Sequence, residues 1–186
     1  MELMNKKIAI LAEDKYEDLE LWYPLLRMKE AGADVSVVGM TGTKTYQSKH
    51  GYPVAVDVAA SAVLDESFDA VIIPGGYAPD RMRRHPPMLD LVRRVSARGG
   101  LVAMICHAGW VPISAGIVNG KKVTSTPAIK DDLINAGAEW IDLEVVQDDN
   151  LISSRGPDDL PAFCQAIIAA LVRQDLRKMA GSDSSV

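Results

Sequence analysis

The sequence predicts an α/β fold, a three-layer sandwich in which helices cover both faces of a mostly parallel sheet. Two observations support this prediction. Short, nearly continuous apolar runs rich in β-branched residues recur along the chain, as is typical of strands buried on both faces. Amphipathic stretches with helical spacing separate these runs, and alternating strands and helices imply parallel strands joined by right-handed crossovers.

The expected central elements follow one another in order from the N-terminus. The first helix places Leu19, Trp22 and Leu26 on one apolar face, and a later helix is expected to end before Gly99. These helices connect strands that the apolar runs place at residues 8–12, 35–39, 70–73 and 101–105.

The remaining elements are expected at the edges of this sheet. A hairpin or an extended excursion is predicted within residues 46–58, and a further hairpin turns at residues 148–150. A closing amphipathic helix over about residues 160–179 completes a single domain of residues 1–180. Residues 181–186 are expected to form a disordered tail.

The composition fits one soluble globular domain. The chain has 186 residues, of which 48% are hydrophobic and 24% charged, and this balance excludes a wholly disordered chain. No apolar run approaches the roughly 20 residues that a membrane-spanning helix needs. The N-terminal segment lacks the apolar core of a signal peptide. We therefore expect a cytoplasmic protein without a membrane partner.

Charge and cysteine content narrow the classes of partner. The formal net charge of −5 disfavours a nucleic-acid surface. A short basic cluster, Arg81, Arg83 and Arg84, is interpreted either as a solvated helix face or as an anion-binding site. The two cysteines lie far apart and are expected to be free thiols. The three histidines are scattered, and no cysteine or acid lies near them at the spacing of metal ligands, so we expect no metal site. Nothing in the sequence indicates another cofactor.

Cys106 carries the strongest functional signal. It directly follows the expected strand 101–105, and the small residues after it allow a sharp strand-to-helix turn on which a nucleophile is presented. At a helix N-terminus the dipole favours the thiolate, which is the nucleophilic form. The alternative interpretation is a buried cysteine at a strand end. That alternative describes Cys164, which lies in an apolar helix.

The strand before Cys106 ends at Pro74-Gly75-Gly76. Glycine lets a substrate approach the backbone, and a free amide such as that of Gly76 forms a candidate oxyanion hole with the amide of His107. The alternative is an ordinary tight turn. Carboxylates crowd the end of the first strand, and most of them are expected only to decorate a helix N-terminus. One such carboxyl, buried near Cys106, would hold a proton and lower the pKa of the thiol.

Four segments form a distinctive combination, although each is weak alone. They are Glu17-Asp18 with Glu20 and Pro24, Pro74-Gly75-Gly76 followed by Tyr77-Ala78-Pro79, Ile105-Cys106-His107, and residues 129–137. Together they resemble the PfpI family of intracellular cysteine peptidases, within the ThiJ/PfpI superfamily. The resemblance covers nearly the whole chain. It implies a flavodoxin-like sandwich, related to class I glutamine amidotransferases, with the nucleophile on the elbow.

The resemblance also implies a role for each matching residue. Cys106 is the nucleophile, and His107 is its neighbouring base and the source of one oxyanion-hole amide. Glu17 is the buried acid that hydrogen-bonds the cysteine. Gly75 and Gly76 form the turn that supplies the second oxyanion donor.

In PfpI-type peptidases the acid that orients the histidine comes from a neighbouring subunit, at the position that matches Asp80. The resemblance therefore implies a homo-oligomer, a dimer or a hexamer, with Asp80 at a subunit interface. The peptidases carry Glu at this position, and the missing methylene shortens the reach of the Asp80 carboxylate. Ala108-Gly109-Trp110 replaces the Gly-Pro that commonly follows the histidine, which changes the pocket beside the nucleophile.

These residues predict a cysteine hydrolase that acts on small carbonyl adducts or peptides. Members of the family are described as peptidases, as glyoxalases that convert methylglyoxal to lactate, and as deglycases of glycated proteins and nucleotides. A single small domain offers no obvious extended groove, which favours glyoxalase or deglycase chemistry. The alternative is a redox-sensing or stress-protective protein whose Cys106 oxidises to sulfinic acid without turnover. A third hypothesis, a holdase chaperone, requires an exposed apolar patch.

Overall fold

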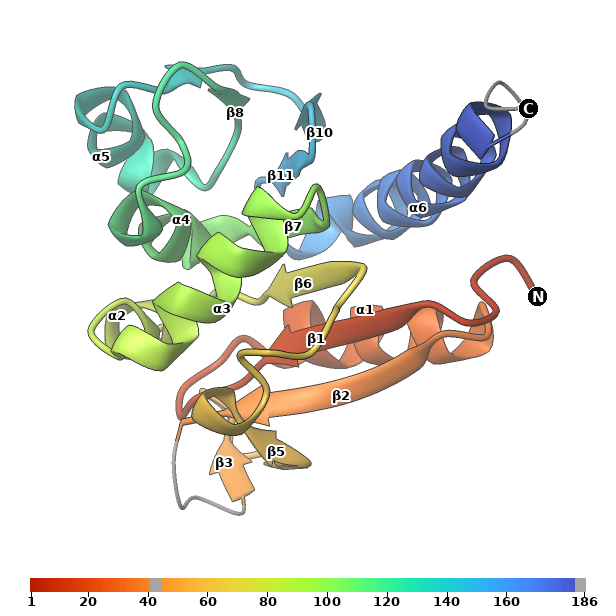
Figure 1. Ribbon diagram of the computed structural model, residues 1–186. Coiled ribbons are helices and arrows are strands. Elements are labelled where there is room, and N and C mark those ends of the chain that lie inside the picture. The colour runs from red at the N-terminus through yellow and green to blue at the C-terminus, as the bar shows by residue number, and fades with distance from the viewer. Residues whose placement is uncertain (41–44, 183–186) are drawn as a thin grey trace.

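The computed structural model describes residues 1–40 and 45–182, with side chains through residue 176 (Figure 1). Within these residues the main sheet has seven strands, and all neighbouring strands are parallel except for one antiparallel pair at an edge. The prediction of a mostly parallel α/β sheet is confirmed. In spatial order the strands are β10 (Val145–Asp148), β11 (Leu151–Ser154), β7 (Leu101–Ile105), β6 (Ala70–Ile73), β1 (Lys7–Leu11), β2 (Asp34–Gly39) and β5 (Val58–Ala59).

The order of the strands identifies the topology. Apart from the short edge strand β5, the parallel strands lie in the order β2-β1-β6-β7-β11. Counted along the chain, this is the order 2-1-3-4-5 of flavodoxin-like folds, so that prediction is confirmed as well. The winding reverses between β1 and β6. Ligands in such sheets bind at the carboxyl ends of the strands beside this reversal, which is where the loops after β1, β6 and β7 meet.

Helices cover both faces of the sheet (Figure 1). Every residue of β6 and β7 is buried, as expected for strands covered on both sides. No helix in the described part of the chain combines the length and the hydrophobicity needed to cross a membrane, and a cytoplasmic location stays a prediction. One face of the sheet carries α1 (Asp18–Glu30) and α6 (Leu160–Ser182), which contact each other. The other face carries α2 (Ala78–Met82), α3 (Pro86–Ala97) and α4 (Trp110–Ala115). The short helix α5 (Lys130–Asn135) lies beside α4.

Both predicted hairpins are present. The first joins β3 (Thr45–Gln47) to β4 (Pro53–Ala55), and the second joins β10 to β11. Because β11 also pairs in parallel with β7, the second hairpin extends the main sheet. A further parallel pair, β8 (Lys122–Val123) with β9 (Glu139–Trp140), has two residues in each strand, too few to leave a periodic pattern in the sequence.

The closing helix extends further than the sequence predicts. α6 begins at Leu160 and continues to Ser182, so residues 181 and 182 belong to the helix. Residues 183–186 of the predicted tail lie outside the described residues.

The predicted apolar face of α1 is not the buried one. Leu19 and Leu26 are 56% and 59% exposed. Apolar residues lie around much of this helix, so helical spacing permits more than one inward face. The helix also continues without interruption through its internal proline. The side chains that it buries are Glu20, Leu21, Pro24, Leu25 and Met28.

Two consecutive leucines test this orientation of α1. Leu25 is 3% exposed, whereas Leu26 lies on the solvent side. Leu25→Ala should lower the free energy of unfolding by about 2–5 kcal/mol, as truncations of buried leucines do. Leu26→Ala should change it by less than about 0.5 kcal/mol. Urea denaturation of both variants measures the difference, and a larger loss for Leu26→Ala would contradict the orientation described here.

Candidate active site

Three loops meet at the carboxyl edge of the sheet and carry the predicted site. Cys106 immediately follows β7 and begins a short 3₁₀ helix, η2 (Cys106–Gly109), which leads into α4. Gly75 and Gly76 follow β6, and Glu17 caps the N-terminus of α1 after β1. The reversal of winding between β1 and β6 therefore brings segments together that are far apart in the sequence.

Cys106 occupies a strained elbow. Its φ is +61°, in the left-handed region that residues other than glycine rarely adopt. The side chain is half-buried, and its Sγ lies 3.3 Å from Nδ1 of His107. This geometry agrees with a nucleophile presented between a strand and a helix rather than with an ordinary core cysteine. Cys164, by contrast, is 1% exposed within α6.

The buried acid at the cysteine is Glu20, so the assignment of this role to Glu17 is wrong. Glu20 is fully buried, its Oε2 accepts a hydrogen bond from the Gly75 N–H at 2.8 Å, and its carboxyl faces Cys106. Its Oε1 has no hydrogen-bond partner among the described residues.

Glu17 stands one helical turn earlier and has a structural role. Its Oε2 accepts a hydrogen bond from the Glu20 N–H at 2.9 Å, and its Oε1 lies 3.7 Å from Nζ of Lys49. Glu17 is thus the N-cap of α1, a position whose side chain turns back toward the helix end. A sequence signal for Glu20 does exist, because it shares a helical face with Leu21 and Pro24, both of which are buried.

The Glu20 and Cys106 side chains are coupled through their protons. Burial raises the pKa of Glu20 to about 7, with a further increase from the charge of Glu17. Burial also raises the pKa of Cys106 to about 12, and the charge of Glu20 adds to this, which is opposite to the lowered thiol pKa that the sequence predicts. A thiolate near neutral pH therefore requires that the shared proton stay on Glu20.

Two backbone amides face the sulfur. The N–H groups of His107 and Gly76 both lower the pKa of Cys106, because they stabilise negative charge there. A Cβ on Gly76, whose φ is +77°, would lie 2.5 Å from the Glu17 nitrogen, so this turn requires glycine. The amide of Gly75 is bonded to Glu20 and is not free, which corrects its predicted place in the oxyanion hole.

His107 is suited to accept a proton. Burial lowers its pKa, and the positive charge of Lys49 lowers it further, which keeps the imidazole neutral at pH 7. The ring of Trp110 lies 5.5 Å from the His107 ring, centroid to centroid. Nε1 of Trp110 donates to Oδ2 of Asp132 at 2.7 Å, which fixes the indole as a wall beside the histidine. Trp110 is thus partly buried against the core and stands beside the imidazole.

Asp80 lies outside this cluster in a single chain. Its carboxylate is exposed at the start of α2, where it pairs with Arg84 at 3.1 Å. Among the described residues, no hydrogen bond or ion pair joins Asp80 to His107. The basic cluster is divided in the same way, because Arg81 pairs with Glu13 and Arg83 donates to Ser114. All three arginines of this cluster therefore have partners within the protein.

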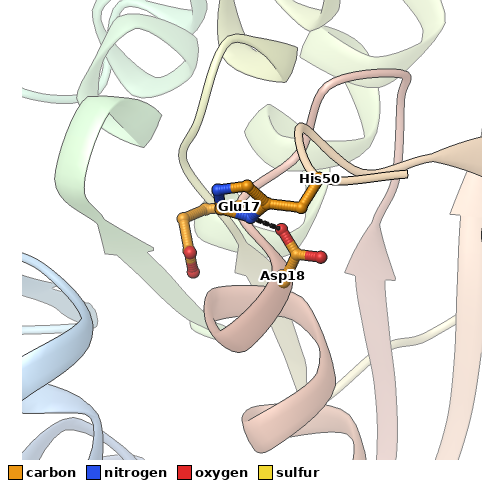
Figure 2. Close-up of side chains that lie close together, drawn as sticks. All are labelled: Glu17, Asp18 and His50. Atoms are coloured by element: carbon orange, nitrogen blue, oxygen red, sulfur yellow. Dashed lines mark hydrogen bonds and ion pairs between the residues drawn. The ribbon is translucent and has the colours of Figure 1, made fainter. Parts of the chain in front are cut away.

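One group of three potential metal ligands occurs in the described residues, Glu17, Asp18 and His50 (Figure 2). Nδ1 of His50 lies 2.7 Å from Oδ2 of Asp18, and the other oxygen of Asp18 accepts a hydrogen bond from Ser48. The carboxylate of Glu17 is bonded to the start of α1, as described above. Protein partners thus already engage these ligand atoms, and the cluster serves to fasten a loop.

Comparison with known proteins identifies the family. A family model described as the DJ-1/PfpI family matches residues 6–170. This chain belongs to the DJ-1/PfpI family. It is 45% identical over 166 residues to a deglycase of Pyrococcus horikoshii, covering 89% of this chain and 99% of that protein. It is 40% identical over 162 residues to protein/nucleic acid deglycase 2 of Escherichia coli, covering 86% of this chain and 94% of that protein.

A solved structure supports the fold within the family. A two-domain protein of Anabaena variabilis, with DJ-1/ThiJ/PfpI-like and ferritin-like domains, matches this chain with a TM-score of 0.87 and 42% identity. The match covers 90% of this chain and 48% of that one, so this chain spans about half of the two-domain protein.

The distinction between Glu20 and Glu17 is testable through the reactivity of Cys106. In the wild type the alkylation rate should rise through about pH 7, where the pair loses its first proton, and then level off. In Glu20→Gln the thiol loses its proton-holding partner while remaining buried, so the rise should move to higher pH. Glu17→Gln removes a charge that raises the pKa of Glu20, so its rise should move slightly to lower pH.

Mass spectrometry of carboxamidomethylated Cys106 measures these profiles, with Cys164 as the internal control. A larger displacement in Glu17→Gln than in Glu20→Gln would contradict the assignment of the buried acid.

Proposed function

We propose that this protein is a cysteine-dependent hydrolase of the deglycase type, which acts on small carbonyl compounds and their adducts. The observation that carries the proposal is the strained Cys106 with two amides directed at its sulfur and a proton-holding carboxyl beside it. The names of the relatives from Pyrococcus horikoshii and Escherichia coli support the same class. Peptide hydrolysis by the same nucleophile is the alternative, and the half-buried sulfur favours a small substrate over a peptide.

The proposed reaction on a 2-oxoaldehyde begins with the proton on Glu20. The Cys106 thiolate attacks the aldehyde carbon, a C–S bond forms, and the carbonyl π electrons move to oxygen. The resulting oxyanion accepts hydrogen bonds from the amides of Gly76 and His107. Transfer of the Glu20 proton to this oxygen gives a hemithioacetal and leaves Glu20 ionised.

The second half of the reaction uses the neutral imidazole of His107. It removes the proton from the carbon bonded to sulfur and returns a proton to the neighbouring carbon, which converts the hemithioacetal into a thioester of a 2-hydroxy acid. Water then cleaves the thioester, releasing the acid and restoring the thiol. Overall, methylglyoxal and one water give lactate and a proton.

Removal of the nucleophile tests this proposal. Cys106→Ala should lower the rate of lactate formation from methylglyoxal by at least about a hundredfold, as losses of a catalytic nucleophile do. The matched control is Cys164→Ser, because Cys164 is buried in α6 away from the three site loops. Chiral analysis of the lactate measures turnover by the protein above the background reaction. Unchanged lactate formation in Cys106→Ala would refute the proposal.

The redox-sensing alternative draws on the same arrangement. A carboxyl that holds a proton beside the sulfur also stabilises a sulfinic acid. Selective dioxidation of Cys106 at low peroxide, together with negligible lactate formation, would favour this alternative.

The proposed active unit is a homo-oligomer in which Asp80 of one subunit orients His107 of its neighbour. Support comes from the resemblance to the peptidases and from the exposed surface around Asp80. Tyr77, three residues earlier, is 73% exposed, which is unusual for a large aromatic side chain.

Dilution tests the contribution of a neighbouring subunit. Activity per chain should fall when the protein is diluted below the concentration at which light scattering shows dissociation. Asp80→Asn should lower activity at all concentrations, whereas Asp90→Asn, which removes a similar exposed carboxylate paired with Arg93, should not. Full activity of the separated chain would contradict the shared site.

A further inference from the structure

A basic side chain, Lys49, borders the site and takes no part in the bond-making and proton-transfer steps described above. Its Nζ lies 3.7 Å from Oε1 of Glu17, and its side chain is 34% exposed. Within the described residues this ion pair is the only polar contact of the ammonium. Since an ammonium carries three N–H donors, Lys49 retains donors that a bound group can use.

The loop that carries Lys49 is fixed to the start of α1. Ser48 is fully buried, and its Oγ donates to Asp18 at 2.5 Å while accepting from the His50 N–H at 3.1 Å. His50 itself bonds to Asp18, as Figure 2 shows. The Lys49 N–H donates to the carbonyl of Tyr16 at 2.9 Å. The backbone of Lys49 is therefore held in place, and only its side chain is free to adjust.

This anchorage places the ammonium beside Glu17, at the border of the site. The partner of Lys49, Glu17, contacts Gly76, whose amide faces the Cys106 sulfur. The charge of Lys49 also lowers the pKa of both Glu20 and His107.

The positive charge of Lys49 offsets a negative charge at the border of the site. Glu17 is a buried acid beside the ammonium, and without a nearby cation its charge would repel an anionic substrate. The Glu17 carboxylate is shared between the Glu20 N–H and the ammonium, and the 3.7 Å separation leaves no tight hydrogen bond to displace.

We propose that Lys49 is a specificity-determining residue that binds a carboxylate attached next to the carbon attacked by Cys106. The site should then prefer carbonyl compounds and thioesters in which the carbon attacked by Cys106 is bonded to a carboxylate. This inference rests on the proposed function for its biological meaning, but it concerns recognition rather than turnover.

Two alkylating reagents of matched size test the proposal without requiring turnover. Iodoacetate and iodoacetamide react alike, since the Cys106 thiolate forms a C–S bond and iodide leaves, but only iodoacetate carries a carboxylate beside the reacting carbon. The ratio of the two rates cancels any change in thiolate population. Lys49→Met should lower the ratio of iodoacetate to iodoacetamide rates roughly threefold to tenfold, as expected for loss of one nearby charge.

Two control variants accompany this measurement. Lys49→Arg should retain most of the ratio, because it keeps the charge. Lys29→Met changes the net charge equally on an exposed part of α1 and should leave the ratio unchanged. A loss in Lys49→Met that iodoacetamide shares equally would mean that Lys49 acts only on protonation, and it would overturn the proposal.

Salt dependence gives a second test that needs no variant. A protein of net charge −5 repels iodoacetate, so general screening by salt should raise the ratio. Attraction by Lys49 predicts the opposite, a fall in the ratio as salt is added, and a rise would overturn the proposal. Failure of methylglyoxal turnover together with a Lys49-dependent ratio would refute the proposed function alone. A Cys106 inert to both reagents would overturn the proposal together with that function.

Discussion

The arrangement of the site depends on the burial of one carboxyl group, that of Glu20. A buried carboxylate without adequate partners costs several kcal/mol, which the protein avoids by letting the group keep a proton near neutral pH. The Gly75 N–H bonds to one of its oxygens, and the Cys106 thiol lies opposite. A Cβ on Gly75 would come within 2.5 Å of Glu20 Oε2 and 2.8 Å of Cys106 Cβ, so only glycine allows the three groups to meet. The identity of the turn residue thus follows from the buried acid.

The topology supplies the rest of the arrangement. The strained conformation of Cys106 costs about 1–3 kcal/mol, which the surrounding structure must offset. It does so by anchoring both sides of the elbow, because β7 is completely buried and α4 packs against α2 and α3. Gly109 lies close to Leu133 of α5, and a Cβ there would approach Ile129 Cδ1 at 2.9 Å. The elbow therefore packs closely against the segment that leads into α5.

The sequence was sufficient for those features that depend on local pattern. The four central strands, both hairpins and the elbow at Cys106 follow from apolar runs, turn residues and small side chains near one another in the chain. Two errors, the exposed Leu19 and Leu26 and the choice of Glu17 over Glu20, have one cause, the rotation of α1 about its axis. That rotation is decided by packing against the sheet and α6, contacts between distant segments that helical periodicity does not encode. The role of Gly75 could not be predicted for the same reason, since it depends on where Glu20 points.

The three buried glutamates after β1 explain why the proton resides where it does. Glu13 pairs with Arg81 at 3.4 Å, and Glu17 pairs with Lys49 at 3.7 Å. Glu20 is the most deeply buried of the three, and among the described residues it has no cation in contact. An acid with a cationic partner is stabilised as an anion, whereas an acid buried without one is stabilised in its protonated form. The pairing of the other two glutamates therefore leaves Glu20 as the acid that exchanges a proton with the sulfur, and it confines the acid–base chemistry of this edge of the sheet to Glu20, Cys106 and the neighbouring His107.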